Sequence, residues 1–188
     1  MMIEEDSKKA SDAELLRLVA GGDEHAFELL VGRYQQAVFN TVYRYTGNSD
    51  DVQDLAQEIF TKVWRNAGKF KGKSKFSTWL YSITANHCIN YRRKNRRGHI
   101  SLDQLALSGK VPDSLKVKPD WEQQRRVRLV RKALDELPNR QRMALILAQF
   151  EGRSYKEIAE IMKVSVSSVE SLIFRARRAI KQKLAKAI

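Results

Sequence analysis

The stretch from residue 153 to residue 183 constrains the fold of this chain most strongly, because it holds two amphipathic segments and a start signal for each. Ser154, followed three positions later by Glu157, forms a capping box, which predicts the start of a helix. Residues 163–164 separate the two apolar stripes, and Ser165 is a suitable cap for a second helix. The spacing therefore predicts a helix-turn-helix.

The outer face of the second helix indicates what this motif binds. At 3.6 residues per turn, one face collects polar, basic and aromatic side chains: Ser167, Ser171, Phe174, Arg175, Arg178 and Lys181. A large aromatic such as Phe174 is not expected on a helix face that contacts only water. An aromatic among arginines and serines is instead typical of a helix that binds the major groove of DNA. The alternative is a basic amphipathic helix packed in a bundle, with Phe174 against a neighbour. We favour DNA.

The distribution of charge supports a polyanionic partner. The 188 residues carry a net charge of +13. Residues 1–30 are mainly acidic, residues 62–97 contain many Lys and Arg and no acid, and residues 153–188 are again basic. Two separate basic blocks predict two contacts with nucleic acid. Either block alone could be a basic surface that only contacts water. That alternative explains residues 62–97 poorly, because this block contains no acid at all.

Several functional classes have no support in the sequence. Cys88 is the only cysteine, so no intramolecular disulfide and no cysteine-based zinc site is expected. We find no signal peptide, no apolar run near 18 residues, no glycine-rich phosphate loop and no nucleophile motif. We therefore expect a cytoplasmic protein that is not an enzyme, has no metal or cofactor, and does not insert into a membrane.

Apolar periodicity and breaker residues predict an all-α chain with two small helical domains joined by a flexible linker. The linker is expected at 98–119, where Gly and Pro are frequent, with a possible short helical turn at 102–107. At full stretch it would span about 75 Å, which would let the two domains sit apart on one partner. Outside the helix-turn-helix, the predicted helices cover about 11–21, 24–45, 50–66, 75–96, 120–137 and 140–150.

Two aromatic residues stand apart from the apolar face of the helix at 50–66. Phe60 and Trp64 are spaced i, i+4 and lie to the side of the stripe that contains Leu55, Ile59 and Val63. Large aromatics away from the main stripe indicate either a second packing partner in the same domain or a docking surface for another protein. The residues alone favour neither.

The second candidate for nucleic-acid binding is the segment from residue 69 to residue 97. Its loop, KFKGKSKF, is basic and aromatic, and the following helix carries a polar row beside its apolar stripe. Within that stripe, His87 is expected to be a core histidine rather than a ligand. The polar row, with Trp79 at its edge, consists of Ser82, Asn86, Asn90 and Arg93.

Together these segments resemble the sigma factors of bacterial RNA polymerase, and specifically the small extracytoplasmic-function group. DVQDLAQEIFTKVWR is similar to the polymerase-binding segment of that family, and KFKGKSKFSTWLYSITANHCINYRRKNRR to its segment for the −10 promoter element. ELPNRQRMALILAQFEGRSYKEIAEIMKVSVSSVESLIFRARRAI is similar to its −35 domain. The three segments follow one another in the order of the family.

The resemblance implies a domain at 11–97 that binds polymerase and the −10 element, and a domain at 120–188 that binds the −35 element. Contacts with polymerase are implied for Asp54, Gln57, Glu58, Phe60 and Trp64. Contacts with single-stranded −10 DNA are implied for Phe70, Lys71, Lys73, Phe76, Trp79, Asn86, Asn90 and Arg93. Contacts with the −35 duplex are implied for Ser167, Ser168, Glu170, Ser171, Phe174, Arg175 and Arg178.

Glu170 departs from a common pattern, since some members carry Arg there. An acid repels phosphate but can accept a hydrogen bond from cytosine N4, so Glu170 bears on the preferred −35 sequence.

The resemblance implies a transcription initiation factor that binds core RNA polymerase and promoter DNA, and a regulatory anti-sigma factor that covers the Phe60–Trp64 patch. A helix-turn-helix activator or repressor that is not a polymerase subunit is the main alternative. Such a regulator needs a sensory domain, and residues 1–97 show no strand–helix alternation for one. A sequence-independent nucleic-acid packing protein is a further alternative.

Overall fold

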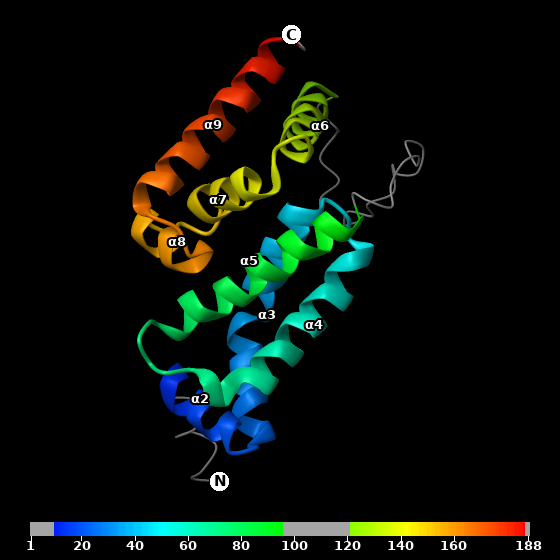
Figure 1. Ribbon diagram of the computed structural model, residues 1–188. Coiled ribbons are helices and arrows are strands. Elements are labelled where there is room, and N and C mark those ends of the chain that lie inside the picture. Colours follow the sequence, from blue (N-terminus) through cyan, green and yellow to red (C-terminus); the bar gives the residue numbers. More distant parts are fainter. Residues whose placement is uncertain (1–9, 96–120, 187–188) are drawn as a thin grey trace.

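The computed structural model describes residues 10–95 and 121–186, and every regular element in these two ranges is a helix (Figure 1). The all-α prediction is confirmed for the described residues. The elements, in chain order, are α2 (Asp12–Ala20), α3 (Glu24–Thr46), α4 (Asp50–Asn66), the 3₁₀ turn η1 (Ala67–Lys69), α5 (Phe76–Asn95), α6 (Trp121–Asp135), α7 (Asn139–Gln149), α8 (Tyr155–Met162) and α9 (Val166–Ala185).

Local capping signals determine where several of these helices begin. Ser154 and Glu157 form the predicted reciprocal capping box at the start of α8, and Ser11 forms an equivalent box before α2. Ser165 accepts a hydrogen bond from the backbone N–H of Ser168 at the start of α9. The turn between α8 and α9 passes through the left-handed conformation at a non-glycine residue. The predicted helix-turn-helix is therefore present.

The N-terminal half is built around the long helix α3. Helices α2, α4 and α5 all pack against α3, and α4 also packs against α5. The buried faces meet at fully buried side chains from different helices, such as Leu30, Val42, Ile59 and Leu80. The apolar residues spaced three or four positions apart, which predicted these helices, are the residues buried between them. Burial of these apolar stripes therefore explains why the helices pack together.

The C-terminal half is built around α7, whose central residues are apolar and entirely buried. Helices α8 and α9 pack against α7, and α6 packs against α9. Helix α9 contributes Val169, Ile173 and Ala176 to this core, which are three of the residues expected on its inner face. Helix α6 ends at Asp135, earlier than predicted, and Pro138 instead precedes the first residue of α7.

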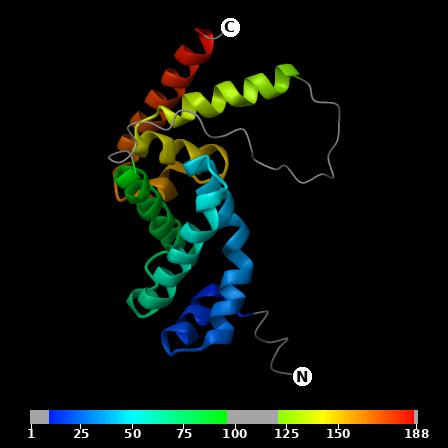
Figure 2. The same ribbon diagram turned by 90° about the vertical axis from the view of Figure 1, so that its right-hand side faces the viewer.

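The two halves lie directly against each other, an arrangement that the sequence did not predict. Helix α5 packs on α8 and α7, and α3 packs on α7 (Figure 2). The sequence did not predict this junction, because its hydrogen bonds join residues between 43 and 107 positions apart. The proposed linker 98–119 and the helical turn at 102–107 lie outside the described residues.

Gly47 allows the chain to turn at this junction. It ends α3 in the left-handed conformation, with a φ angle of 77°. A Cβ atom there would come within 3.6 Å of Asp135 and 3.8 Å of Arg142 in the other half. Glycine adopts this conformation at little cost, so it suits a helix end that faces a second surface closely.

The capping box of α8 supports a stability prediction. We expect Ser154→Ala to lower the free energy of unfolding by about 1 kcal/mol, because it leaves first-turn N–H groups without their acceptor. Chemical denaturation followed by circular dichroism measures the change. Lys156→Ala, at an exposed position of the same helix, is the control and should change the free energy by less than about 0.5 kcal/mol. Equal effects of the two substitutions would contradict the prediction.

Candidate DNA and polymerase interfaces

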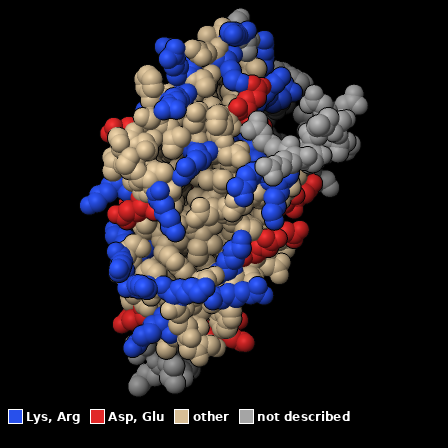
Figure 3. Space-filling view, in the orientation of Figure 1, with Lys and Arg blue, Asp and Glu red and all other residues tan. Residues whose placement is uncertain are grey.

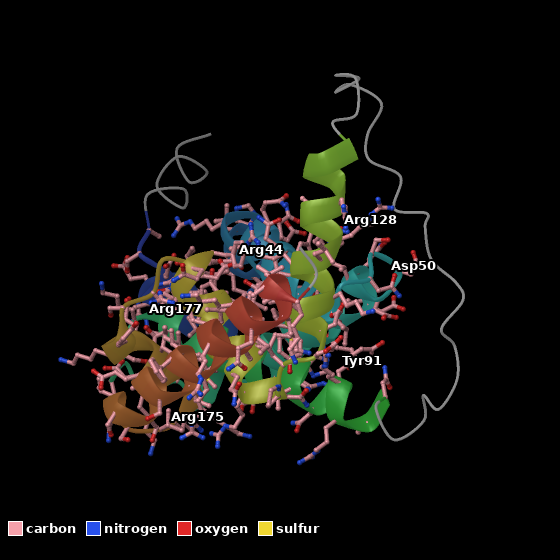
Figure 4. All side chains as sticks on the ribbon, turned by 90° about the horizontal axis from the view of Figure 1, so that it is seen from above. Arg44, Asp50, Tyr91, Arg128, Arg175 and Arg177 are labelled. Carbon is pink, nitrogen blue, oxygen red and sulfur yellow. The ribbon has the colours of Figure 1, made fainter. Side chains whose placement is uncertain are left out.

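The outer face of α9 is the most open of the candidate surfaces. Phe174 is 66% exposed, the largest value among the exposed large hydrophobic residues of the described chain. Arg175 and Arg178, one and four positions after it, are also exposed, and Arg175 points away from the body of the molecule (Figure 4). Neither arginine has an acidic partner among the described residues. An exposed aromatic beside free guanidinium groups can contact base edges and phosphates.

Hydroxyl groups are concentrated at the first turn of α9. The hydroxyl oxygen of Ser165 lies 3.0 Å from that of Ser167 and 2.8 Å from that of Ser168. Ser167 and Ser171 are exposed, whereas Ser168 is half-buried. Glu170 is exposed in the same turn, so its carboxylate faces solvent next to the serines. The start of α9 therefore presents both donors and acceptors.

Basic side chains extend over the surface beyond this helix. Figure 3 shows Lys and Arg spread across one face of the molecule, with Asp and Glu mainly toward its edges. Lys71 and Lys73 are exposed in the loop between η1 and α5, and Arg93 is exposed near the end of α5. Such side chains can contact phosphates without reading sequence.

A cavity of about 330 Å³ lies between α4, η1 and α5. Asn86 and Asn90 are on its α5 side and Trp79 is at its edge, so three residues of the −10 set meet in one place. Both asparagines are exposed, and an asparagine amide can both donate and accept hydrogen bonds. The complete lining is Lys62, Asn66, Lys69, Trp79, Ile83, Asn86, His87 and Asn90.

The α4 side of this cavity was not identified from the sequence. Lys62 and Asn66 are one helical turn apart, and the side-chain amide of Asn66 donates to the backbone carbonyl of Lys62 at 2.8 Å. An i, i+4 pair of polar residues along one flank of the apolar stripe was a signal that could have identified it. Only the packing of α4 on α5 brings the pair next to Asn86.

The aromatic residues of the −10 set differ in their availability. Phe70 and Trp79 are half-buried and pack on each other, with ring centroids 5.4 Å apart. Phe76 is 4% exposed and packs edge-to-face on Tyr34. Phe76 is therefore a core residue in this structure, whereas the side chains of Phe70 and Trp79 are partly open to solvent.

His87 forms the floor of the cavity and is buried, as expected of a core histidine. Its Nδ1 atom is in contact with the ammonium of Lys62. Its Nε2 atom lies 3.0 Å from Glu58, outside hydrogen-bond geometry. Burial lowers the pKa of His87 below its ordinary value, the positive charge of Lys62 lowers it further, and Glu58 opposes this only in part. The neutral imidazole is thus the favoured form.

The third candidate surface is an apolar groove of about 580 Å³ between α3 and α4. Trp64 packs edge-to-face on Phe27, with centroids 5.1 Å apart, and Phe60 is only 8% exposed. The second packing partner considered for these aromatics is therefore α3. They also line the groove, whose complete lining is Phe27, Val31, Gln35, Phe39, Gln53, Ala56, Gln57, Phe60, Thr61 and Trp64.

The five residues proposed for polymerase contact do not share one face. Gln57 is exposed and lines the groove with Phe60 and Trp64. Asp54 and Glu58 are also exposed but are not part of the groove lining, and Glu58 turns toward His87. Helix α4 therefore offers an apolar surface toward α3 and an acidic surface elsewhere.

Two further observations concern other kinds of site. Within residues 10–95 and 121–186, no three His, Cys, Asp or Glu side chains are grouped so that they could hold a metal ion. Among the helices of these ranges, none combines the length and hydropathy needed to cross a membrane.

Comparisons with known proteins identify the family of this chain. Residues 30–98 match the family model for sigma-70 region 2, and residues 128–180 match that for sigma-70 region 4. The first range contains the α4–α5 cavity and the lining of the α3–α4 groove except Phe27, and the second contains the helix-turn-helix as far as Ile180. The molecule thus belongs to the class of helical proteins with a region 2 and a region 4.

Curated relatives match over almost their whole length. The chain is 38% identical to the ECF RNA polymerase sigma-E factor of Escherichia coli K12, over 95% of this chain and 96% of that protein. It is 37% identical to the RNA polymerase sigma-H factor of Pseudomonas aeruginosa, over 92% of this chain and 93% of that protein. The chain belongs to the extracytoplasmic-function sigma factors.

Solved structures show the same fold. CnrH, solved with the cytosolic domain of CnrY, superposes with a TM-score of 0.69 at 24% identity, covering 94% of this chain and 99% of that one. The sigma factor RpoE of Bartonella quintana, solved with the anti-sigma factor NepR, gives a TM-score of 0.64 at 24% identity, covering 85% and 96%.

The family defines the activity of the chain. It is a non-enzymatic transcription initiation factor that binds core RNA polymerase and directs it to promoters through −35 and −10 elements. A helix-turn-helix regulator that acts apart from polymerase is not favoured, because region 2 accounts for the N-terminal half.

The buried His87 supports a prediction about pH. Because its pKa is lowered on folding, the unfolded chain binds a proton more readily, and stability is lost as pH falls from about 6.5 toward the folded pKa. The loss is at most about 1.4 kcal/mol per pH unit for this one group. Denaturant titrations of the wild type and His87→Gln between pH 7.5 and 5.5 measure it. The variant should show a shallower dependence, and identical slopes would contradict the assignment.

Proposed function

We propose that this sigma factor opens the −10 element by capturing an unpaired base in the cavity between α4 and α5. The observation that supports this is the lining itself, in which asparagine amides, lysine ammonium groups and an indole edge surround one space. Asn86 and Asn90 would hydrogen-bond the Watson–Crick edge of a base, which is hidden in a duplex. Lys62 and Lys69 would contact the neighbouring phosphates.

Capture of this kind would melt DNA because it favours only the single strand. A basic surface binds the duplex and the single strand alike, so it shifts no equilibrium between them. Stacking on Trp79 or Phe70 contributes roughly 1–3 kcal/mol per base. Extrusion of a base costs a few kcal/mol. The free energy gained by capturing one or two bases is therefore comparable to the cost of extruding them from the −10 duplex.

We assign −35 recognition to the outer face of α9. Arg175 or Arg178 would read a base edge, while the serines and the other arginine would contact phosphates. Phe174 would contact a thymine methyl group, and Glu170 would accept from cytosine N4. The proposed domains are 11–97 and 120–188, with 98–119 as the linker.

We assign core polymerase docking to the groove between α3 and α4. Its floor is apolar and includes Phe60 and Trp64, while Gln53 and Gln57 provide an exposed polar rim. This arrangement matches an interface with an aromatic centre and a polar edge. Asp54 and Glu58 would contribute charge beside the groove. Phe60 is too buried for a clean binding test, because truncating it would also disturb the core.

An anti-sigma factor is proposed as a regulatory partner. Two of the similar structures are complexes of CnrH with CnrY and of RpoE with NepR. We propose that a comparable partner covers the groove that holds Phe60 and Trp64. The protein would act in the cytoplasm, where its polymerase is found.

The −10 proposal predicts a defect in opening rather than in binding. Holoenzyme with Asn86→Ala should bind a closed promoter nearly normally but open it roughly 5- to 150-fold more slowly, because a base-edge contact of about 1–3 kcal/mol is lost. A fluorescent base analogue in the −10 element measures extrusion. Ser82→Ala, in the same polar row but outside the cavity lining, is the control. A pre-melted −10 bubble should restore initiation, and normal opening of the duplex by Asn86→Ala would refute the assignment.

The docking proposal predicts that charge at the rim of the groove weakens the holoenzyme. Gln57→Lys, an exposed position on α4, should reduce the affinity for core polymerase at least tenfold, because it places an ammonium group over an apolar floor. Fluorescence anisotropy of labelled sigma factor measures the affinity. Gln36→Lys makes the same change at an exposed position of α3 outside the groove and should have little effect. Equal affinities for the two variants would show that the docking site is not this groove.

A further inference from the structure

A row of three ionisable side chains lies along the cavity between α4 and α5. Glu58 and Lys62 are one turn apart on α4, and the imidazole of His87, from α5, lies between them. Its Nδ1 atom is in contact with the ammonium of Lys62, and its Nε2 atom is 3.0 Å from a carboxylate oxygen of Glu58. A Glu and a Lys at this spacing on a helix can pair directly with each other, but here the imidazole stands between the two charges.

The members of this row differ in how freely they can move. His87 is buried, whereas Lys62 is exposed and lines the cavity together with Asn86 and Asn90. A ring packed in the interior has few positions open to it, while a lysine side chain at the surface has many rotamers. The contact with His87 therefore restricts where the Lys62 ammonium can lie.

The contact with Lys62 also determines which nitrogen of His87 carries the proton. An ammonium group can only donate, so Nδ1 must present its lone pair and the proton of the neutral ring must be on Nε2, on the side of Glu58. An imidazolium has no free lone pair and carries a positive charge of its own. Proton uptake by His87 would therefore end the contact with Lys62 and leave Glu58 as the partner of the ring.

The surroundings of His87 favour its neutral form. Burial is the first cause of its lowered pKa, and the Lys62 ammonium is the second. The carboxylate of Glu58 opposes both, and Lys94 of α5 lowers the pKa further. Lys69, from η1, adds another positive charge to the lining of the same cavity. The contact between His87 and Lys62 is therefore present at neutral pH and is lost as the pH falls through the lowered pKa of His87.

We propose that His87 is a positioning residue for opening of the −10 element: it holds the Lys62 ammonium at the cavity, where Lys62 contacts the backbone phosphate of the captured base, and it releases Lys62 on taking up a proton. This inference rests on the proposed capture of a −10 base in the cavity. A lysine that is fixed before DNA binds loses less freedom on binding, so the same phosphate contact contributes more to capture. Promoter opening should then depend on pH through His87, although the buried ring itself does not touch the base.

Opening rates of the holoenzyme, measured with a fluorescent base analogue in the −10 element, test the link between the two residues. Lys62→Met removes the ammonium and should slow opening about fivefold, which corresponds to one ordinary hydrogen bond. His87→Leu removes the acceptor and should slow opening by a similar factor. The double variant should be no slower than Lys62→Met alone, because both substitutions remove the same contact. Factors that multiply, or a normal rate for either single variant, would overturn the proposal.

The pH profile separates positioning from a purely structural role. The ratio of the wild-type opening rate to that of Lys62→Met should decrease as the pH falls from 7.5 to 5.5, because the imidazolium no longer holds Lys62. His87→Asn supplies a neutral acceptor oxygen near the former Nδ1 position. The ratio of His87→Asn to the double variant His87→Asn/Lys62→Met should therefore stay constant over the same range. Each ratio cancels the pH dependence of polymerase itself.

Two results of the pH comparison would overturn the proposal. A wild-type ratio that stays constant would show that protonation of His87 does not release Lys62. A ratio that increases in acid would show that the imidazolium itself contacts DNA. His25→Asn changes an exposed histidine of α3 and should leave the wild-type profile unchanged. Circular dichroism checks that each variant is folded, and if His87→Leu loses helix, the pH comparison decides alone.

Asn86→Ala distinguishes this inference from the proposed function on which it rests. Slow opening by Asn86→Ala together with normal opening by Lys62→Met and His87→Leu would reject the positioning role and retain base capture in the cavity. Normal opening by all three variants would reject base capture as well.

Discussion

The guanidinium of Arg142 sets the strictest constraint on this structure, because it is a charge almost completely removed from water. Such a group is tolerated only where carboxylates, carbonyls and aromatic faces replace its hydration. Asp135 supplies the carboxylate from the same half, while the Arg44 carbonyl and the Tyr45 ring come from the other half. The close approach at Gly47 depends on the same meeting of α3 with α6 and α7. Arg142 therefore fixes one part of how the halves sit together, beside the apolar packing of α5 on α8.

The functional surfaces occupy positions that this junction leaves free. The outer face of α9, the α4–α5 cavity and the α3–α4 groove all contain exposed residues although the halves are in contact. Contact between the halves therefore leaves these candidate surfaces uncovered.

Helix α4 shows how one element serves several purposes. Its apolar stripe, with Ile59 and Val63 fully buried, holds the N-terminal half together. Its Phe60–Trp64 side meets α3 and lines the groove, while Lys62 and Asn66 face the cavity shared with α5. A helix 17 residues long can present three faces to three surroundings. Substitutions in α4 should therefore be interpreted face by face.

The sequence by itself determined the helices, their caps and the two faces of α9, because these depend on residues within a few positions of one another. Ser154 with Glu157 and the stripe that holds Val169 and Ile173 needed no long-range information. The tertiary structure alone decided that Phe60 packs on α3, that Lys62 joins Asn86 in one cavity, and that Glu151 joins the two halves. These contacts link residues far apart in the chain, and no local pattern records which helix faces will meet.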